Sequence, residues 1–116
     1  MLLNVSVVDL GTHTVLRVNG EIDMATSPDL RQQIVEQIRQ GNIELIVDLA
    51  GVDFIDSTGL GVLIGGLKRA RSQGGNLRVS GVQGRIERLF ELTGLGDVLV
   101  VVDIDDSDGG SESLTL

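Results

Sequence analysis

The sequence predicts a single α/β domain with helices packed on a mixed, mostly parallel sheet. Short β-rich runs alternate along the chain with segments in which apolar residues recur at helical spacing. The run over residues 43–49 is apolar on both faces, which is typical of a central parallel strand. The elements are expected in the order ββαβαβαβ, and such alternation favours parallel strands joined by helices.

The first two expected strands cover residues 5–10 and 13–20. Gly11 and Thr12 lie between them, and so short a connection between two β-rich runs predicts a hairpin. Residues 20–26, with the sequence GEIDMAT, are expected to form a loop.

The first helix is expected to begin with Ser27 as its N-cap and Pro28 at its first position. Its apolar stripe consists of Leu30, Ile34, Val35 and Ile38, and Gly41 ends it. The strand over 43–49 follows.

The second helix is expected over residues 57–73, because four apolar residues there recur at i, i+3, i+4 and i+7. These residues are Leu60, Leu63, Ile64 and Leu67. A strand over 76–80, a short helix over 85–94 closed by Gly94, and a last strand over 97–103 complete the expected domain.

Length and composition exclude several kinds of protein. A chain of 116 residues is long enough for one ordinary domain, expected here over 1–103 and followed by an acidic tail over 104–116 that is expected to be flexible. It has no cysteine, which excludes disulfides and thiolate metal sites, and its net charge of −8 argues against nucleic acid or an anionic membrane as partner. No apolar run is long enough to insert into a bilayer, and no signal peptide is recognisable, so we expect a soluble domain in the cytoplasm.

The stretch Asp56-Ser57-Thr58-Gly59 sits where the central strand gives way to the second helix, a position where α/β proteins often keep their chemistry. Its hydroxyls could serve as a nucleophile, as part of a phosphate-binding loop, or as a site of modification. The single histidine, His13, is far away in the first hairpin, and no G-x-S-x-G elbow, complete G-x-G-x-x-G or phosphate-binding G-x-x-x-x-G-K-[ST] is present. We therefore expect no enzyme activity, no cofactor and no metal.

Four glycines in the second helix need a reason, since each costs about 0.5–1 kcal/mol relative to alanine. Close packing of the helix on the sheet is expected to explain Gly65 and Gly66. Gly59 and Gly61 lie in the first turn beside the hydroxyls, where missing side chains would leave the helix start open to another molecule.

The motif Asp56-Ser57-Thr58-Gly59-Leu60-Gly61 resembles the signature of the anti-sigma-factor antagonists of the STAS-domain family. The segments VNGEID at 18–23 and LFELTGL at 89–95, and the helix after Ser27-Pro28, agree with that family in order and spacing. The resemblance covers residues 3–103, so it implies a STAS-like fold for nearly the whole chain.

The resemblance implies that the protein binds an anti-sigma factor, a serine kinase of the histidine-kinase-like ATPase type, and so releases a sigma factor. The kinase would phosphorylate Ser57, with Thr58 as the less favoured acceptor, and a serine phosphatase would reverse this. The implied docking face contains Glu21, Asp23, Met24, Thr26, Asp56, Ser57, Thr58, Gly59 and Gly61. The family also contains stressosome and lipid-transport subunits, so the alternative is a nucleotide-binding or scaffold module. We expect a monomer or weak dimer.

Overall fold

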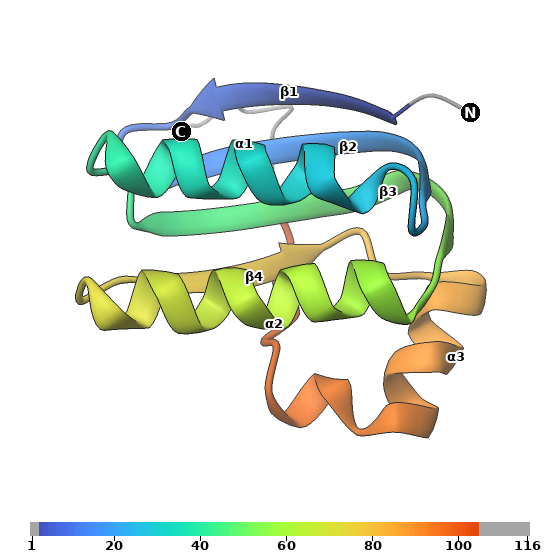
Figure 1. Cartoon of the computed structure of the whole chain (residues 1–116). Coiled ribbons are helices and arrows are strands. Elements are labelled where there is room, and N and C mark those ends of the chain that lie inside the picture. The colour runs from blue at the N-terminus through green and yellow to red at the C-terminus, as the bar shows by residue number, and fades with distance from the viewer. Residues whose placement is uncertain (1–2, 105–116) are drawn as a thin grey trace, which may run out of the picture.

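Four strands form one sheet in the order β1-β2-β3-β4 (Figure 1). This computed structural model describes residues 3–104. β1 (Leu3–Asp9) runs antiparallel to β2 (Thr14–Ile22), whereas β2, β3 (Glu44–Ile55) and β4 (Asn76–Ser80) are parallel to one another. The predicted mixed, mostly parallel sheet and its N-terminal hairpin are therefore confirmed.

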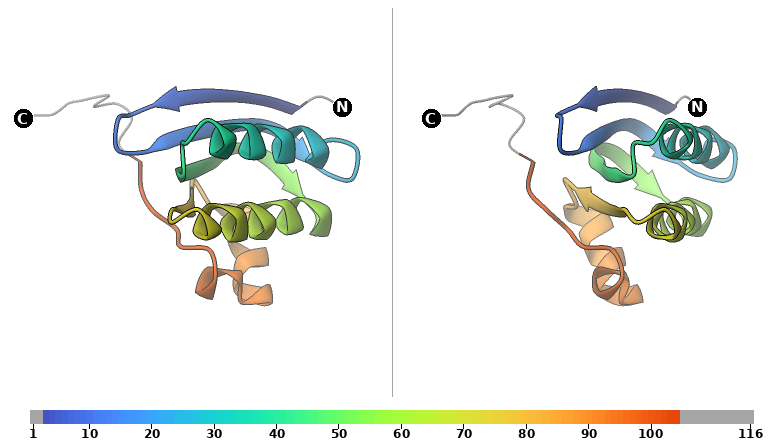
Figure 2. Two further views of the ribbon diagram at one scale, coloured as in Figure 1. Left: turned by 60° about the vertical axis from the view of Figure 1, so that its left-hand side comes forward. Right: turned by 90° about the vertical axis from the view of Figure 1, so that its left-hand side faces the viewer.

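Two long helices provide the crossovers between the parallel strands. α1 (Ser27–Arg39) connects β2 to β3, and α2 (Ser57–Ser72) connects β3 to β4. The two helices lie side by side on one face of the sheet, as Figure 2 shows in both of its views. α3 (Gly84–Thr93) and the short 3-10 helix η1 (Leu95–Asp97) follow β4. The chain after η1 passes along the face of the sheet that α1 and α2 leave uncovered (Figure 2).

The core lies between the sheet and the layer formed by α1 and α2. Each apolar side chain that is fully removed from water there contributes about 1.5–3 kcal/mol to folding. Its fully buried members include Leu16, Val18, Ile22, Leu30, Ile34, Leu45, Val47, Leu49, Leu63 and Val79. The predicted apolar stripes of both helices thus face the sheet, except for Val35, which is not part of this core. Within residues 3–104, no helix is both long enough and apolar enough to traverse a bilayer.

The predicted N-cap of α1 is wrong by one residue. Thr26 takes the N-cap position and Ser27 is the first helical residue, so Pro28, which was expected at the first position, is the second. The reason is a turn before the helix, in which the Asp23 carbonyl accepts hydrogen bonds from the amides of Thr26 and Ser27 at 3.2 and 2.7 Å. This turn brings Ser27 into helical geometry and buries it.

The predicted last strand over 97–103 is also wrong. Gly94 has a left-handed conformation with φ of 73°, which ends α3 and turns the chain into η1. In the described part of the chain after η1, a single parallel bridge joins Val101 to Val79. Through it, the Val79 amide donates to the Val100 carbonyl at 3.0 Å and the Val102 amide donates to the Val79 carbonyl at 2.8 Å. The observed order is therefore ββαβαβα, and the predicted acidic tail lies, from residue 105 onward, outside the described residues.

Burial predicts that one side chain anchors the segment after η1. Leu99 is 0% exposed in the core, whereas Val100 is 48% exposed. Leu99→Ala should lower the free energy of unfolding by about 2–4 kcal/mol because it leaves a cavity. Val100→Ala should change the free energy of unfolding by less than about 0.5 kcal/mol. Urea denaturation of both variants measures the difference, and equal losses would show that the segment is not held by Leu99.

Candidate functional site

The two loops singled out in the sequence lie together at one edge of the sheet. Ile22, the last residue of β2, pairs with Ile55, the last residue of β3. The amide of Asp56 donates to the carbonyl of Ile22 at 3.1 Å, which ties the start of α2 to the loop after β2. Because β2 and β3 are parallel, their carboxyl ends share an edge of the sheet, and the two loops that follow them lie side by side.

β3 is longer than the predicted strand over 43–49 and continues to Ile55. Its pairing with β2 shifts register twice, between Arg17 and Asn19 and again between Gly20 and Glu21, because β3 contains an extra residue at each place. The strand thereby reaches the end of β2 and places Asp56 beside Ile22. The extension also presents Phe54, which is opposite Glu21 and 45% exposed, an apolar residue at this edge that the sequence analysis did not single out.

Asp56 is the N-cap of α2. Its Oδ1 accepts hydrogen bonds from the amides of Thr58 at 2.9 Å and Gly59 at 3.2 Å, and from the Thr58 hydroxyl. The Thr58 hydroxyl, with the amides of Gly59, Thr58 and Met24, lowers the pKa of the Asp56 carboxyl below its ordinary 3.8, although partial desolvation opposes this shift. Because Met24 belongs to the loop after β2, both loops contribute to the electrostatic environment of this carboxylate.

The two adjacent hydroxyls of the motif differ in their surroundings. Thr58 uses its hydroxyl to donate to Asp56. Ser57 is exposed at the first position of α2, and within residues 3–104 its hydroxyl has no hydrogen-bond partner. Ser57 is therefore the hydroxyl that is free to meet another molecule.

The loop after β2 is held in shape by its own polar side chains. Asp23 Oδ1 accepts from the amides of Ala25 at 2.9 Å and Thr26 at 3.0 Å. The Thr26 hydroxyl donates to the Glu21 carbonyl at 2.6 Å and accepts from the Asp23 amide at 2.9 Å. Thr26 is consequently 4% exposed, while Met24, at the tip of the loop, is 76% exposed.

The structure brings the predicted docking residues to one edge of the sheet but exposes them unequally. Thr26 and Gly59 are buried. The side chains of Glu21, Asp23 and Asp56 are partly exposed, and those residues of the set that are open to solvent are Met24, Ser57, Thr58 and Gly61.

Helix packing explains two of the four glycines of α2. A Cβ on Gly59 would lie 2.6 Å from Ile22 Cγ2 and 2.7 Å from Ile55 Cγ1. A Cβ on Gly66 would lie 2.9 Å from Leu77 Cδ1. All three distances are too short for a real contact, so glycine at these two positions lets α2 approach the sheet and its neighbours closely.

Gly61 and Gly65 have no such reason. A Cβ at either position would meet nothing within 4 Å, and neither residue has a positive φ. Gly65 was expected to pack against the sheet and does not, whereas Gly59 was expected to leave the helix start open and is a packing residue. Both expectations are therefore wrong. It remains a prediction for Gly61 that the missing side chain serves another molecule.

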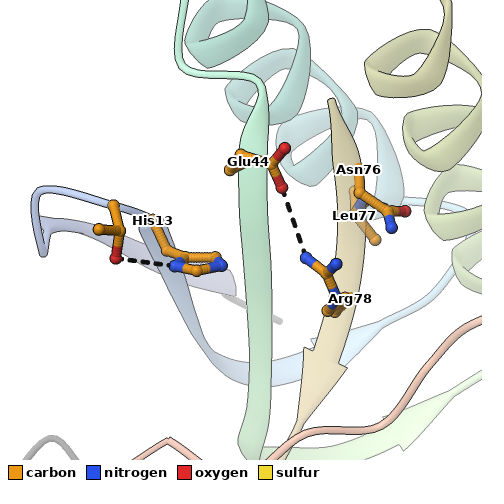
Figure 3. A network of polar contacts seen from close by, with 6 residues as sticks. His13, Glu44, Asn76, Leu77 and Arg78 are labelled. Atoms are coloured by element: carbon orange, nitrogen blue, oxygen red, sulfur yellow. Dashed lines mark hydrogen bonds and ion pairs between the residues drawn. The ribbon is translucent and has the colours of Figure 1, made fainter. Parts of the chain in front are cut away.

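The single histidine of the sequence is remote from Ser57. His13 precedes β2, whereas Ser57 follows the far end of β3, so the length of a nine-residue strand, about 30 Å, separates their ends of the sheet. Its Nδ1 lies 3.0 Å from the Thr12 hydroxyl, beside the ion pair of Arg78 with Glu44 at 3.4 Å (Figure 3). His13 thus cannot act as a base for Ser57 in this chain.

Asp56 should make stability depend on pH. Its pKa is lowered in the folded protein, so its contribution is complete above the ordinary value of 3.8 and is lost as the pH falls through the lower folded value. At pH 7, Asp56→Ala should reduce the melting temperature, and Asp56→Asn should reduce it less because asparagine also caps helices well. The deficit of Asp56→Ala should shrink at pH 2–3 in thermal scans by circular dichroism. A deficit that is the same at both pH values would rule out the ionised cap.

Comparisons with known proteins agree with this geometry. The sequence profile of the STAS domain matches residues 4–107. An anti-sigma-B factor antagonist of Staphylococcus epidermidis is 39% identical over 101 residues, which cover 87% of this chain and 94% of that protein. One of Bacillus subtilis strain 168 is 39% identical over 111 residues, covering 95% of this chain and 98% of that protein.

Solved structures show the same fold. An anti-sigma factor antagonist from Mycobacterium paratuberculosis superposes with a TM-score of 0.80 at 29% identity, covering 91% of this chain and 90% of that one. Unphosphorylated SpoIIAA superposes with a TM-score of 0.69 at 20% identity, covering 91% of this chain and 92% of that one, which supports the fold alone. The profile match over nearly the whole chain and the relatives at 39% identity lead to one conclusion: this chain belongs to the STAS domain family.

Proposed function

We propose that this protein is an anti-sigma factor antagonist that binds an anti-sigma factor serine kinase, releases a sigma factor, and is switched off by phosphorylation of Ser57. The observation that carries the proposal is the free, exposed hydroxyl of Ser57 at the first position of α2, beside a Thr58 hydroxyl that is already engaged. Relatives that are 37–39% identical over most of their length and are named anti-sigma-B factor antagonists support it. A switch of this kind operates in the cytoplasm, where sigma factors act, and a serine phosphatase resets it.

The local geometry favours Ser57 over Thr58 as the acceptor. Phosphorylation of Thr58 would remove the proton that its hydroxyl donates to Asp56. It would also place a phosphate against the Asp56 carboxylate, whose pKa is lowered and which is ionised at neutral pH. Ser57 has neither obstacle, because its hydroxyl is unpartnered within the described residues.

The kinase has to supply the catalytic groups for phosphoryl transfer to Ser57. The Ser57 oxygen forms the new bond to the γ-phosphorus of ATP, the bond to the departing ADP breaks, and the hydroxyl proton leaves to a base. His13 is at the other end of the sheet, and Asp56 Oδ1 is occupied by the helix cap. The antagonist therefore acts as a substrate and a ligand, while the kinase provides the base, the nucleotide and its metal.

Phosphorylation should act on the interface and leave the fold intact. It adds about −1.5 to −2 charges at the N-terminus of α2, where negative charge favours the helix by roughly 0.3–1 kcal/mol. On the docking face, the same charge would join Asp56 and Asp23 and would face the nucleotide phosphates of the kinase. Like charges held close across an interface cost several kcal/mol, which is enough to release the kinase.

The acceptor can be identified by mass spectrometry after incubation with the kinase and ATP. Wild type and Thr58→Ala should each gain one phosphate, and Ser57→Ala should gain none. Thr58→Ala is the matched control because it removes the neighbouring hydroxyl on the same helical turn. Phosphate that persists on Ser57→Ala and disappears from Thr58→Ala would assign the modification to Thr58.

Two variants separate binding from modification. Ser57→Ala should bind the kinase and remain bound in ATP, since it cannot be phosphorylated. Ser57→Asp should fold like wild type by circular dichroism but bind at least about tenfold more weakly in calorimetry, because it adds a charge to the docking face. Wild-type affinity for Ser57→Asp, with Asp56 and Asp23 unchanged, would contradict an electrostatic off-switch.

A further inference from the structure

A groove of about 290 Å³ runs between α1 and α2 and is continuous with the motif through Thr58. α2 contributes Gly61, Val62, Gly65 and Gly66 to its walls, in addition to Thr58. α1 contributes Val35 from the opposite side. The docking residues expected from the sequence include Thr58 and Gly61 but none of the remaining lining residues, so most of this groove is new to the site.

The two glycines without a packing role both line the groove. Neither Gly61 nor Gly65 has a neighbour that a Cβ would meet within 4 Å, and neither has a backbone conformation that excludes side chains. Alanine at these positions would favour the helix without disturbing the folded domain. Their shared location in one groove, four residues apart on the same helical face, indicates that the space above them is kept open.

The groove also carries an unusual local charge. Arg31 of α1 and Arg69 of α2 line it, and it has no acidic lining residue. Both arginines are exposed, and neither forms an ion pair with any residue from 3 to 104. The whole chain has a net charge of −8, so this groove is a cationic strip on an acidic protein.

We propose that this groove receives an acidic, partly apolar segment of the kinase. The inference rests on the proposed function and identifies the chemistry of the partner surface. Carboxylates of that segment would pair with the guanidinium groups of Arg31 and Arg69, which suit bidentate contacts. Its apolar side chains would cover Val35 and Val62, and its backbone would approach α2 over the open glycines.

Charge reversal tests the pairing. The probes are the anti-sigma factor kinases encoded in the same genome, each purified and titrated against this protein by calorimetry. Arg31→Glu and Arg69→Glu should each weaken binding about tenfold or more at low salt, and this loss should become smaller as the salt concentration rises. Arg71→Glu is the matched control, because Arg71 shares the last turn of α2 with Arg69 but does not line the groove. It should change affinity by no more than about twofold.

Gly65→Gln tests whether the groove above Gly65 has to stay open. The substitution should raise the melting temperature and lower the affinity for the kinase. Glutamine is a good helix former, so the melting temperature of the free domain should rise. Its side chain would fill the groove above Gly65, so affinity for the kinase should fall about tenfold. A variant that is merely damaged would lose stability together with binding.

The possible results are distinguishable. If wild type binds a kinase and the Arg31, Arg69 and Gly65 variants bind as tightly as Arg71→Glu, the groove is not part of the interface and the inference is overturned. If wild type binds none of the kinases, the proposed function itself fails. Tight binding by wild type with losses confined to the groove variants is the result that we expect.

Discussion

The site depends on the carboxylate of Asp56. This one group accepts hydrogen bonds from the amides of Thr58 and Gly59 and from the Thr58 hydroxyl, and the amide of Met24 in the other loop helps to lower its pKa. The Asp56 amide completes the junction by donating to Ile22. The side chain of Asp56 thus fixes the start of α2, and the backbone amide of the same residue joins that start to the end of β2.

This arrangement gives two adjacent hydroxyls different roles. Thr58 is held by Asp56, so it belongs to the framework, whereas Ser57 precedes it on the helix and stays free. Because Gly59 has no side chain, the first turn of α2 packs directly against Ile22 and Ile55. This close packing holds the backbone of Ser57 in place. A kinase that docks here meets a preformed surface, and little conformational entropy is lost on binding.

Much of the fold could be predicted from the sequence, because periodicity and turn residues mark most elements. The hairpin, β4, and the amphipathic helices α1 and α2 are examples. The extension of β3 to Ile55 could not be predicted, since Gly51 and Asp53 interrupt the apolar pattern and the strand continues through its pairing with β2, despite two shifts of register. The apolar run after residue 97 predicted a strand, but its chain reaches β4 only at Val79 and is held chiefly by burial of Leu99.

The site itself was predictable in position and less so in detail. The motif identifies Asp56 and Ser57. The roles of the four glycines depend on the side of the helix on which each one lies, and their distance from the helix start does not predict this. Gly59 and Gly66 are seven residues apart, and a Cβ at either would meet packed side chains, although Gly66 also borders the groove. Gly61 and Gly65 are four apart, line the groove, and have no packed neighbour that a Cβ would meet. Thr26 is buried in the loop after β2, where its hydroxyl donates a hydrogen bond to the Glu21 carbonyl. This arrangement depends on tertiary structure, and the spacing of residues in the sequence does not indicate it.

The most direct test of this account is a nitrogen-15 NMR titration of the labelled protein with its kinase, in the unphosphorylated and phosphorylated forms. The account predicts that amide shifts concentrate in residues 21–26 and 56–69 and along α1 at Arg31. It also predicts that phosphorylation by itself leaves the amides of core residues such as Leu45 and Leu77 nearly unmoved while abolishing the titration. Shifts that centre on α3, or a phosphorylated form whose core amides move throughout, would contradict it.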